Sequence, residues 1–222
     1  MQYEVKCKPF PVVVCNMANG DKIKCQRGAM AWMTPNMSME TKTGGLGKMF
    51  SKALTGESLF ENVYEAKGDG MIAFTTGVPG DILTVDVSTP IVAQKRSFLA
   101  GDVTVEMETF FAKKFGAGLL GGEGFVMQKF SGSGTVFLEI DGNVMEYTLQ
   151  QGQSMIVDTG TLAAMEATCS MDVVQVEGLG NKLAGGEGWF NTKVSGPGKV
   201  WLQTMPVSSL ADAVRPYIPT GR

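Results

Sequence analysis

Residues 185–190 read GGEGWF and are followed at 193–202 by KVSGPGKVWL, and the same pattern stands earlier in the chain. There, residues 121–126 read GGEGFV and residues 129–138 read KFSGSGTVFL, with every shared residue type at the same internal spacing. Glycines and aromatic residues that keep fixed positions in separate stretches are typical of a structural unit that occurs more than once in a chain.

A third, fainter copy lies upstream. GESLF begins at Gly56, and KGDGMIAF follows at 67–74, with two extra residues before the glycine pair. The glutamates of the three copies, Glu57, Glu123 and Glu187, stand at steps of 66 and 64 residues (123 − 57 and 187 − 123). A period this regular predicts a triplicated unit.

The residues that precede these Gly-Glu elements repeat as well. Met-Glu-Thr occurs at 39–41 and again at 107–109, and Met171 takes the same place 64 residues further on (171 − 107). Because strand-like and loop-like segments both recur, we predict a single domain made of repeats. The three repeats and the C-terminal tail are expected at about 1–75, 76–139, 140–205 and 206–222.

The composition indicates an all-β protein. Twenty-nine glycines without a collagen period are typical of turns and bulges between strands. Turn residues at 19–21 (NGD) and 141–143 (DGN) separate short apolar runs, and each predicts a hairpin. Near the end of the chain, Ser209 and Asp212 have the spacing of a capping box and predict a short helix that Pro216 ends.

Charge and cysteine content narrow the functional classes. The net charge of −3 and the pI near 5.1 argue against a general nucleic-acid binder, which needs a positive field. No apolar run approaches the roughly 18 residues of a membrane-spanning helix, and no signal-like segment opens the chain, so a cytoplasmic protein is expected. The four cysteines lack a C-x-x-C pair and are predicted to be reduced and partly buried.

Histidine is absent from the sequence. This excludes an imidazole base, a histidine-containing triad and a histidine-ligated metal. Catalysis would have to rest on carboxylates, lysines or tyrosines, so the sequence favours a protein that is not an enzyme, with no catalytic residue, cofactor or metal ligand predicted.

The repeated glutamates are nevertheless binding candidates. Glu57, Glu123 and Glu187 could act as acids and bases or hold a hard cation if the loops cluster. The structural interpretation, which we favour, is that each glutamate bonds to backbone N–H groups of its glycine turn or pairs with the lysine that follows, at 67, 129 or 193.

A cluster of aromatic and basic residues also allows both a functional and a structural interpretation. Phe110, Phe111, Lys113, Lys114 and Phe115 combine rings and positive charge, which suits single-stranded RNA or an anionic lipid surface. Such clusters more often bury the rings and leave the lysines in water.

Methionines gather around Trp32, and we interpret them as core filling rather than as an adaptable binding surface. They are Met30, Met33, Met37 and Met39.

The triple Gly-Glu-Gly-aromatic and Ser-Gly-x-Gly-x-Val-aromatic-Leu pattern resembles a family of uncharacterised bacterial and archaeal proteins related to the yeast altered-inheritance-of-mitochondria proteins. The resemblance covers the chain from about Tyr3 to Tyr217. It implies a fold similar to that of the tryptophan-responsive RNA-binding attenuation protein. That fold is a double-stranded β-helix or β-sandwich, here repeated three times about a pseudo-three-fold axis, in a homotrimer. The basic RNA-contacting edge of the attenuation protein has no matching motif in this sequence.

These observations lead to one main prediction and two alternatives. We expect a non-enzymatic β protein that acts as an oligomeric binding or scaffold module, with copies of itself and a further protein as partners. The first alternative is a carboxylate-based enzyme or a cation-binding protein at the Gly-Glu loops. The second is a membrane-surface or single-stranded RNA binder at residues 110–115.

Overall fold

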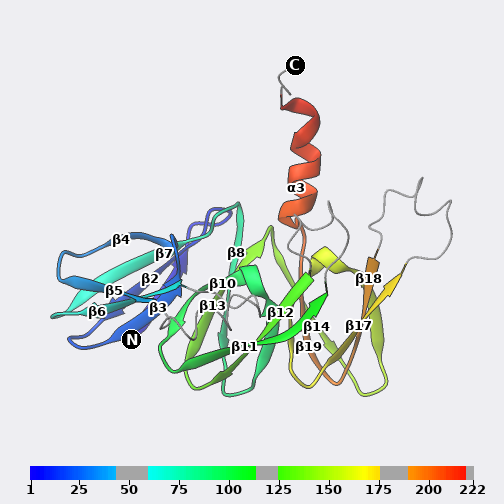
Figure 1. Ribbon diagram of the computed structural model, residues 1–222, viewed down its shortest axis with the longest axis horizontal. Helices are drawn as coiled ribbons and strands as arrows, with labels where there is room; N and C mark the ends of the chain where they lie inside the picture. The colour runs from blue at the N-terminus through cyan, green and yellow to red at the C-terminus, as the bar shows by residue number, and fades with distance from the viewer. Residues whose placement is uncertain (44–59, 114–124, 176–189, 219–222) are drawn as a thin grey trace.

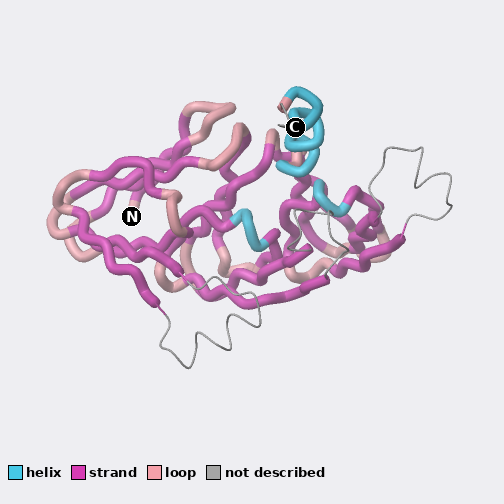
Figure 2. The backbone as a smooth tube through the Cα atoms, turned by 45° about the horizontal axis from the view of Figure 1, so that its top comes forward, coloured by secondary structure: helices cyan, strands magenta, loops and turns pink. Residues whose placement is uncertain are grey.

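The computed structural model describes residues 1–43, 60–113, 125–175 and 190–218. In these residues almost every regular element is a β-strand, and the others are an α-helix near the C-terminus and a few short 3-10 turns (Figures 1 and 2). This confirms the predicted all-β class with its short C-terminal helix. Among the described residues, no helix combines the length and the apolar character that crossing a membrane requires.

The strands fall into three sets of six, preceded by β1 (Gln2–Lys6). The first set is β2 (Val12–Met17), β3 (Lys22–Gln26), β4 (Met30–Met33), β5 (Met37–Thr43), β6 (Phe60–Ala66) and β7 (Gly70–Thr75). The second is β8 (Gly80–Asp86), β9 (Ile91–Gln94), β10 (Phe98–Asp102), β11 (Val105–Lys113), β12 (Phe125–Gly132) and β13 (Thr135–Asp141). The third is β14 (Val144–Leu149), β15 (Ser154–Asp158), β16 (Leu162–Glu166), β17 (Ser170–Gln175), β18 (Phe190–Ser195) and β19 (Gly198–Gln203).

Each set makes the same four antiparallel pairings. In the first set β2 and β4 flank β7, and β3 and β5 flank β6. The second and third sets pair in the same order, β8 and β10 with β13, β9 and β11 with β12, β14 and β16 with β19, and β15 and β17 with β18. One set therefore contributes two groups of three strands that lie in different sheets, as in a sandwich.

Sheets are shared between neighbouring sets. Sheet B has the order β5-β6-β3-β10-β13-β8, and sheet C has the order β11-β12-β9-β16-β19-β14. Each of these six-stranded sheets takes three strands from one set and three from the next. Sheet A (β1-β2-β7-β4) and sheet D (β15-β18-β17) hold the remaining groups of three strands, at opposite ends of the molecule (Figure 1).

Three apolar cores fill the spaces between successive sheets. Tyr64 and Phe74 belong to the first core, Phe130 and Ile140 to the second, and Met127 with its neighbours to the third. The inward positions alternate with exposed ones along the strands, as in β2, where Val13, Cys15 and Met17 are buried. Core packing therefore joins the sheets into one elongated row, with the strand sets following one another along its length.

Two predicted hairpins are wrong. The turn after β2 leads to β3 in sheet B, although β2 lies in sheet A, and the turn after β13 leads from sheet B to β14 in sheet C. Gly20 and Gly142 have φ values of +87° and +76°, so the turn residues do adopt the tight conformation that their sequence predicts. Such a turn reverses the chain, but it does not decide whether the two strands that it joins bond to each other.

The row of strand sets is open. β4 ends sheet A and β15 ends sheet D, and the two strands do not pair with each other within the chain. The expected arrangement of repeats about a pseudo-three-fold axis differs from this order, because a closed ring of three sets would have joined those edges. The chain forms a segment with two ends instead.

The C-terminal helix α3 (Val207–Val214) projects from the row and continues into the 3-10 turn η4 (Arg215–Tyr217). The short turns η1 (Lys95–Ser97) and η3 (Thr159–Thr161) lie between strands. The helix begins two residues before Ser209, and its cap position is Pro206, which offers no side-chain bond. The carboxylate of Asp141 accepts the Val207 N–H instead, at 2.7 Å.

Candidate functional site

The repeated glutamates that the sequence singled out, Glu57, Glu123 and Glu187, all lie outside the described residues. Lys114 also lies outside them, and Lys113 closes β11 with a side chain that is not described. The clustering of the Gly-Glu loops and the surface around these lysines therefore stay predictions.

Two of the repeat lysines form ion pairs, one across neighbouring strands and one between the end of a strand and the turn that follows it. Lys129 of β12 lies opposite Glu108 of β11, and their side chains form an ion pair of 3.3 Å. Lys67 contacts Glu65 at 2.7 Å. Strand pairing makes Val63 the counterpart of Lys129, since Val63 lies opposite the equivalent Glu40, so the predicted correspondence of Lys67 with Lys129 is wrong. Lys67 lies four residues after Val63, in the turn that follows β6.

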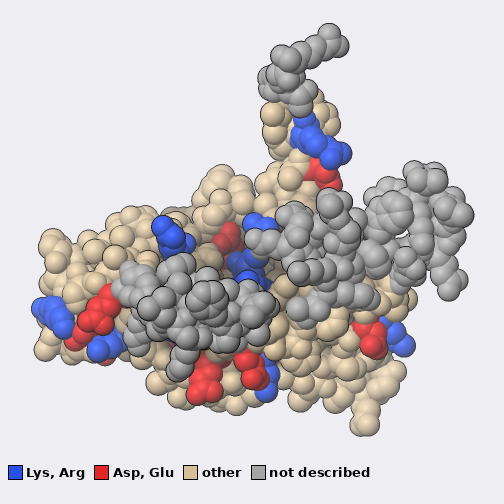
Figure 3. Space-filling view, in the orientation of Figure 1, with Lys and Arg blue, Asp and Glu red and all other residues tan. Residues whose placement is uncertain are grey.

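In the aromatic and basic cluster at residues 110–115, the two described phenylalanine side chains point to opposite faces of β11. Phe111 packs against the third core and meets the ring of Phe125 edge to face, with centroids 6.2 Å apart. Phe110, its neighbour on the strand, faces outward. On the face drawn in Figure 3, the described Lys, Arg, Asp and Glu side chains form small groups that include both signs, and they do not line up as a basic stripe.

Sequence reasoning missed a pair of partly buried carboxylates on β13. Glu139 accepts the Gly77 N–H at 2.7 Å, and burial, with the nearby Asp141 as a smaller cause, raises the pKa of Glu139. Burial likewise raises the pKa of Asp141, against the opposing effects of its bond from Val207 and of Arg96. Both carboxylates serve backbone N–H groups, one in the 76–79 turn and one at the start of α3, which is a structural role. Their i, i+2 spacing on a strand places them on one face, and this is the only sequence signal for the pair.

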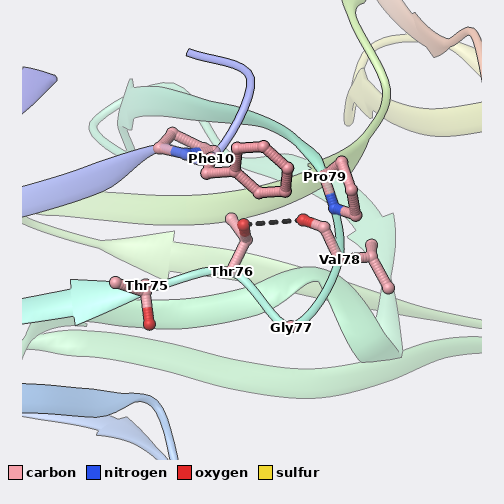
Figure 4. Close-up of a pocket in the computed structure, with 7 residues that line it drawn as sticks. Phe10, Thr75, Thr76, Gly77, Val78 and Pro79 are labelled. Carbon is pink, nitrogen blue, oxygen red and sulfur yellow. Dashed lines mark hydrogen bonds between the residues drawn. The ribbon is translucent and has the colours of Figure 1, made fainter. Parts of the chain in front are cut away.

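A small pocket opens beside the same turn. It has a volume of about 160 Å³ and is lined by Phe10, Pro11 and residues 75–79. In Figure 4 the ring of Phe10 lies beside Pro79, above the turn in which the Thr76 hydroxyl donates to the Val78 carbonyl oxygen at 2.8 Å. No charged side chain lines this pocket, so it offers no acid, base or metal ligand.

The buried polar side chains of the described residues are bonded within the fold. Every buried side-chain nitrogen or oxygen in the described part of the chain has a hydrogen-bond partner, and no group of three acidic or thiol residues there has the geometry of a metal site. Cys15, Cys25 and Cys169 are buried as predicted, whereas Cys7 is exposed. Burial, with Asp102 as a second cause, raises the pKa of the Cys15 thiol to about 12, so that thiol is no nucleophile at neutral pH.

Apolar side chains are exposed on β4, which ends sheet A, and on β15, which ends sheet D. On β4, Trp32 and Met33 are 47% and 37% exposed, and on β15, Ile156 is 66% exposed. Exposed apolar side chains on unpaired edges are typical of surfaces that associate with another chain. The prediction that the methionines around Trp32 fill a core is correct for Met37, which is buried, and wrong for Met33 and Met39, which face solvent.

Comparisons with known proteins agree with the fold and give no activity. Residues 3–205 match the profile of a family described as "Mitochondrial biogenesis AIM24". An uncharacterised protein of Streptococcus pyogenes serotype M6 is 28% identical over 228 residues, which cover 96% of this chain and 88% of that protein. A crystal structure of a protein from Streptococcus pyogenes superimposes with a TM-score of 0.80 at 24% identity, covering 98% of this chain and 99% of the other. That likeness shows the fold.

Proposed function

The chain belongs to the AIM24 family, and from that premise we propose that it is a non-enzymatic protein that assembles with copies of itself into a scaffold or binding platform. The observation that carries the proposal is the exposure of Trp32, Met33 and Ile156 on strands that have no neighbour in the sheet on one side. Their burial against another chain would remove both the apolar surface and the open edges.

The site chemistry supports the same proposal. The described carboxylates with raised pKa hold backbone groups, the pocket lacks charged residues, and Lys129 forms an ion pair with Glu108 on the neighbouring strand. A scaffold needs none of these groups for catalysis. As part of the proposal, the three strand sets are repeats of one unit within a single domain, and the assembly is a cytoplasmic homotrimer that presents its surface to a further protein.

Native mass spectrometry of the purified protein tests the proposal, with light scattering at micromolar concentration as a second measurement. We expect an assembly of defined subunit number and no retained small molecule. A monomer over the whole concentration range would overturn the scaffold, and so would substrate turnover that is lost in Glu123→Gln.

A further inference from the structure

The two complete sheets show how consecutive strand sets are joined. In sheet B, β10 of the second set pairs with β3 of the first, and Ala100 lies opposite Cys25 and Gly101 opposite Lys24. In sheet C, β16 of the third set pairs with β9 of the second. The corresponding pairs there are Ala164 with Ala93 and Met165 with Val92. The same junction therefore occurs twice, with the same direction.

The register of the two junctions is identical once positions are matched between sets. β4, β10 and β16 each carry a bulge against their inner neighbour, between Met30 and Trp32, Phe98 and Ala100, and Leu162 and Ala164. This feature makes Trp32 the counterpart of Ala100 and Ala164. The strands on the other side of the junction are matched by their own partners. Tyr64, Phe130 and Val194 are equivalent positions, and they lie opposite Ile23, Ile91 and Met155, which are therefore counterparts of one another.

The four strand positions of the two central pairs are all buried where the junction is formed, and three of them are exposed where it is missing. The fourth, Val157, is 8% exposed because it also belongs to the third core. Ala100 and Ala164 have 0% exposure, whereas their counterpart Trp32 has 47%. On the opposite strand, Val92 has 0% and Lys24 8%, whereas their counterpart Ile156 has 66%. The side chains are apolar at both ends of the row, so the ends have the chemistry of a junction without its partner.

We propose that β4 of one copy pairs with β15 of the next copy in the register of the two internal junctions. Trp32 then lies opposite Val157, Met33 opposite Ile156, and Thr34 opposite Met155. This pairing joins sheets D and A into β17-β18-β15-β4-β7-β2, the strand order of sheets B and C, with β1 added at its outer edge. The proposal rests on the proposed assembly function and names the surface that mediates it.

Other edge strands do not compete for this role. β5 and β8 end sheet B, and β11 and β14 end sheet C, so these strands are edges even where the six-stranded sheet is complete. Among the described strands, only β4 and β15 are edges at a position that is paired in both complete sheets. Since the contact joins unlike surfaces, copies associate head to tail, and they form a ring when the rotation from one copy to the next divides a full turn evenly.

Disulfide trapping tests the contact and its register. Each chain carries Cys7→Ser, which removes the exposed thiol, and one new cysteine, either Met33→Cys or Ile156→Cys. An equimolar mixture of the two variants should give covalent dimers under mild oxidation, because directly opposed strand residues have Cβ atoms close enough for a disulfide. Met33→Cys mixed with Met155→Cys is the control, since a shift of one residue points the two side chains to opposite faces.

The head-to-tail direction predicts that either variant alone gives no more than background cross-linking. Efficient trapping of Met33→Cys with itself, or equal trapping of the shifted control, would overturn the proposed junction.

Disruption of the edge gives an independent measurement. The Thr34 N–H donates to the Met71 carbonyl oxygen of β7 at 2.9 Å, so the N–H of the preceding Met33 points to the open side of β4. Met33→Pro therefore removes a donor to the partner without removing a bond within the chain. Ile156→Glu buries a charge in the junction, and Met145→Glu is its control, because Met145 is also exposed, at 48%, but lies on β14.

We expect Met33→Pro and Ile156→Glu to lower the subunit number to a folded monomer at micromolar concentration, while Met145→Glu keeps the wild-type mass. Far-UV circular dichroism confirms that each variant remains folded. If the wild type assembles and both junction variants reach the same subunit number as the wild type, the proposed contact between β4 and β15 is wrong while the scaffold function stands. A monomeric wild type would overturn both.

Discussion

Asp141 connects β13 to the C-terminal helix, because its carboxylate accepts the first N–H of α3. In Asp141→Ala this N–H loses its partner, and we expect the free energy of unfolding to fall by about 1.5 kcal/mol, as for the loss of a helix cap. Urea denaturation measures the change. Asp212→Ala is the matched control: it removes an exposed carboxylate within α3 whose contact is the 3.5 Å ion pair with Arg215, and it should cost less than about 0.5 kcal/mol. Equal losses in both variants would contradict the capping role.

Glu139 should impose a pH dependence of unusual sign. Its pKa in the folded protein is raised from the usual 4.5, chiefly by burial, so the folded state holds the proton more tightly than the unfolded chain does. The resulting stabilisation is present below the unfolded pKa and is lost as the pH rises through the folded value. We expect Glu139→Gln to gain stability relative to the wild type as the pH rises from about 4 to about 7.

The measurement is urea denaturation of both proteins across that pH range, with Glu65→Gln as a control of opposite sign. A hydrogen bond from Lys67 is the main cause that lowers the pKa of Glu65, so its contribution is present at neutral pH and is lost as the pH falls through the folded pKa. Parallel curves for wild type and Glu139→Gln would contradict the raised pKa.

At the scale of elements, the approach of β8 to β13 depends on Gly80. A Cβ atom at this position would lie 2.0 Å from the carbonyl oxygen of Ile140, a backbone atom that can move only with its strand. We expect Gly80→Ala to lower the free energy of unfolding by about 3 kcal/mol, measured by thermal or urea denaturation. Gly152→Ala is the control, because its Cβ would meet open space and the cost is limited to about 1 kcal/mol from the positive φ of +82°. A Gly80 variant no less stable than this control would contradict the close approach.

Elements were easier to predict from the sequence than their partners. The Met-Glu-Thr runs and the residues after the Gly-Glu elements do form paired strands, as Glu108 opposite Lys129 illustrates. The hairpins at Gly20 and Gly142 were not correct, because turn chemistry is local whereas the choice of sheet depends on which core each strand covers. Glu139 and Asp141 were missed for a related reason, since burial in the folded state, and not residue type, raises their pKa.

At the scale of the whole molecule, β1 lies outside the three sets and covers the outer edge of β2. Deleting residues 2–6 removes this strand and the contact of Tyr3 with Phe137, whose centroids are 5.0 Å apart. We expect a loss of about 2 kcal/mol in stability and an unchanged subunit number, because β1 and β4 are opposite edges of sheet A. Light scattering and urea denaturation measure the two effects. If this deletion dissociated the protein to monomers, the proposed contact between copies at β4 would be wrong.

The open ends of the row could not be foreseen from the sequence. Trp32 and Ile156 look like core residues, and their counterparts in the other sets are indeed buried, so residue type alone does not separate them. What separates them is their place in the row, which only the strand pairing reveals.

Because each six-stranded sheet is shared between two consecutive sets, it can be completed only after the second of those sets has left the ribosome. When the first set has emerged, Cys25 on β3 still lacks the strand that will cover it, and only synthesis of the second set delivers Ala100 to that place. In the same way, Val92 on β9 of the second set gains its partner Met165 only when the third set has been made. Within the described part of the chain no strand pairs with the open edge of β15, so under the proposed head-to-tail contact sheets D and A are joined only when the newly made protein meets another copy.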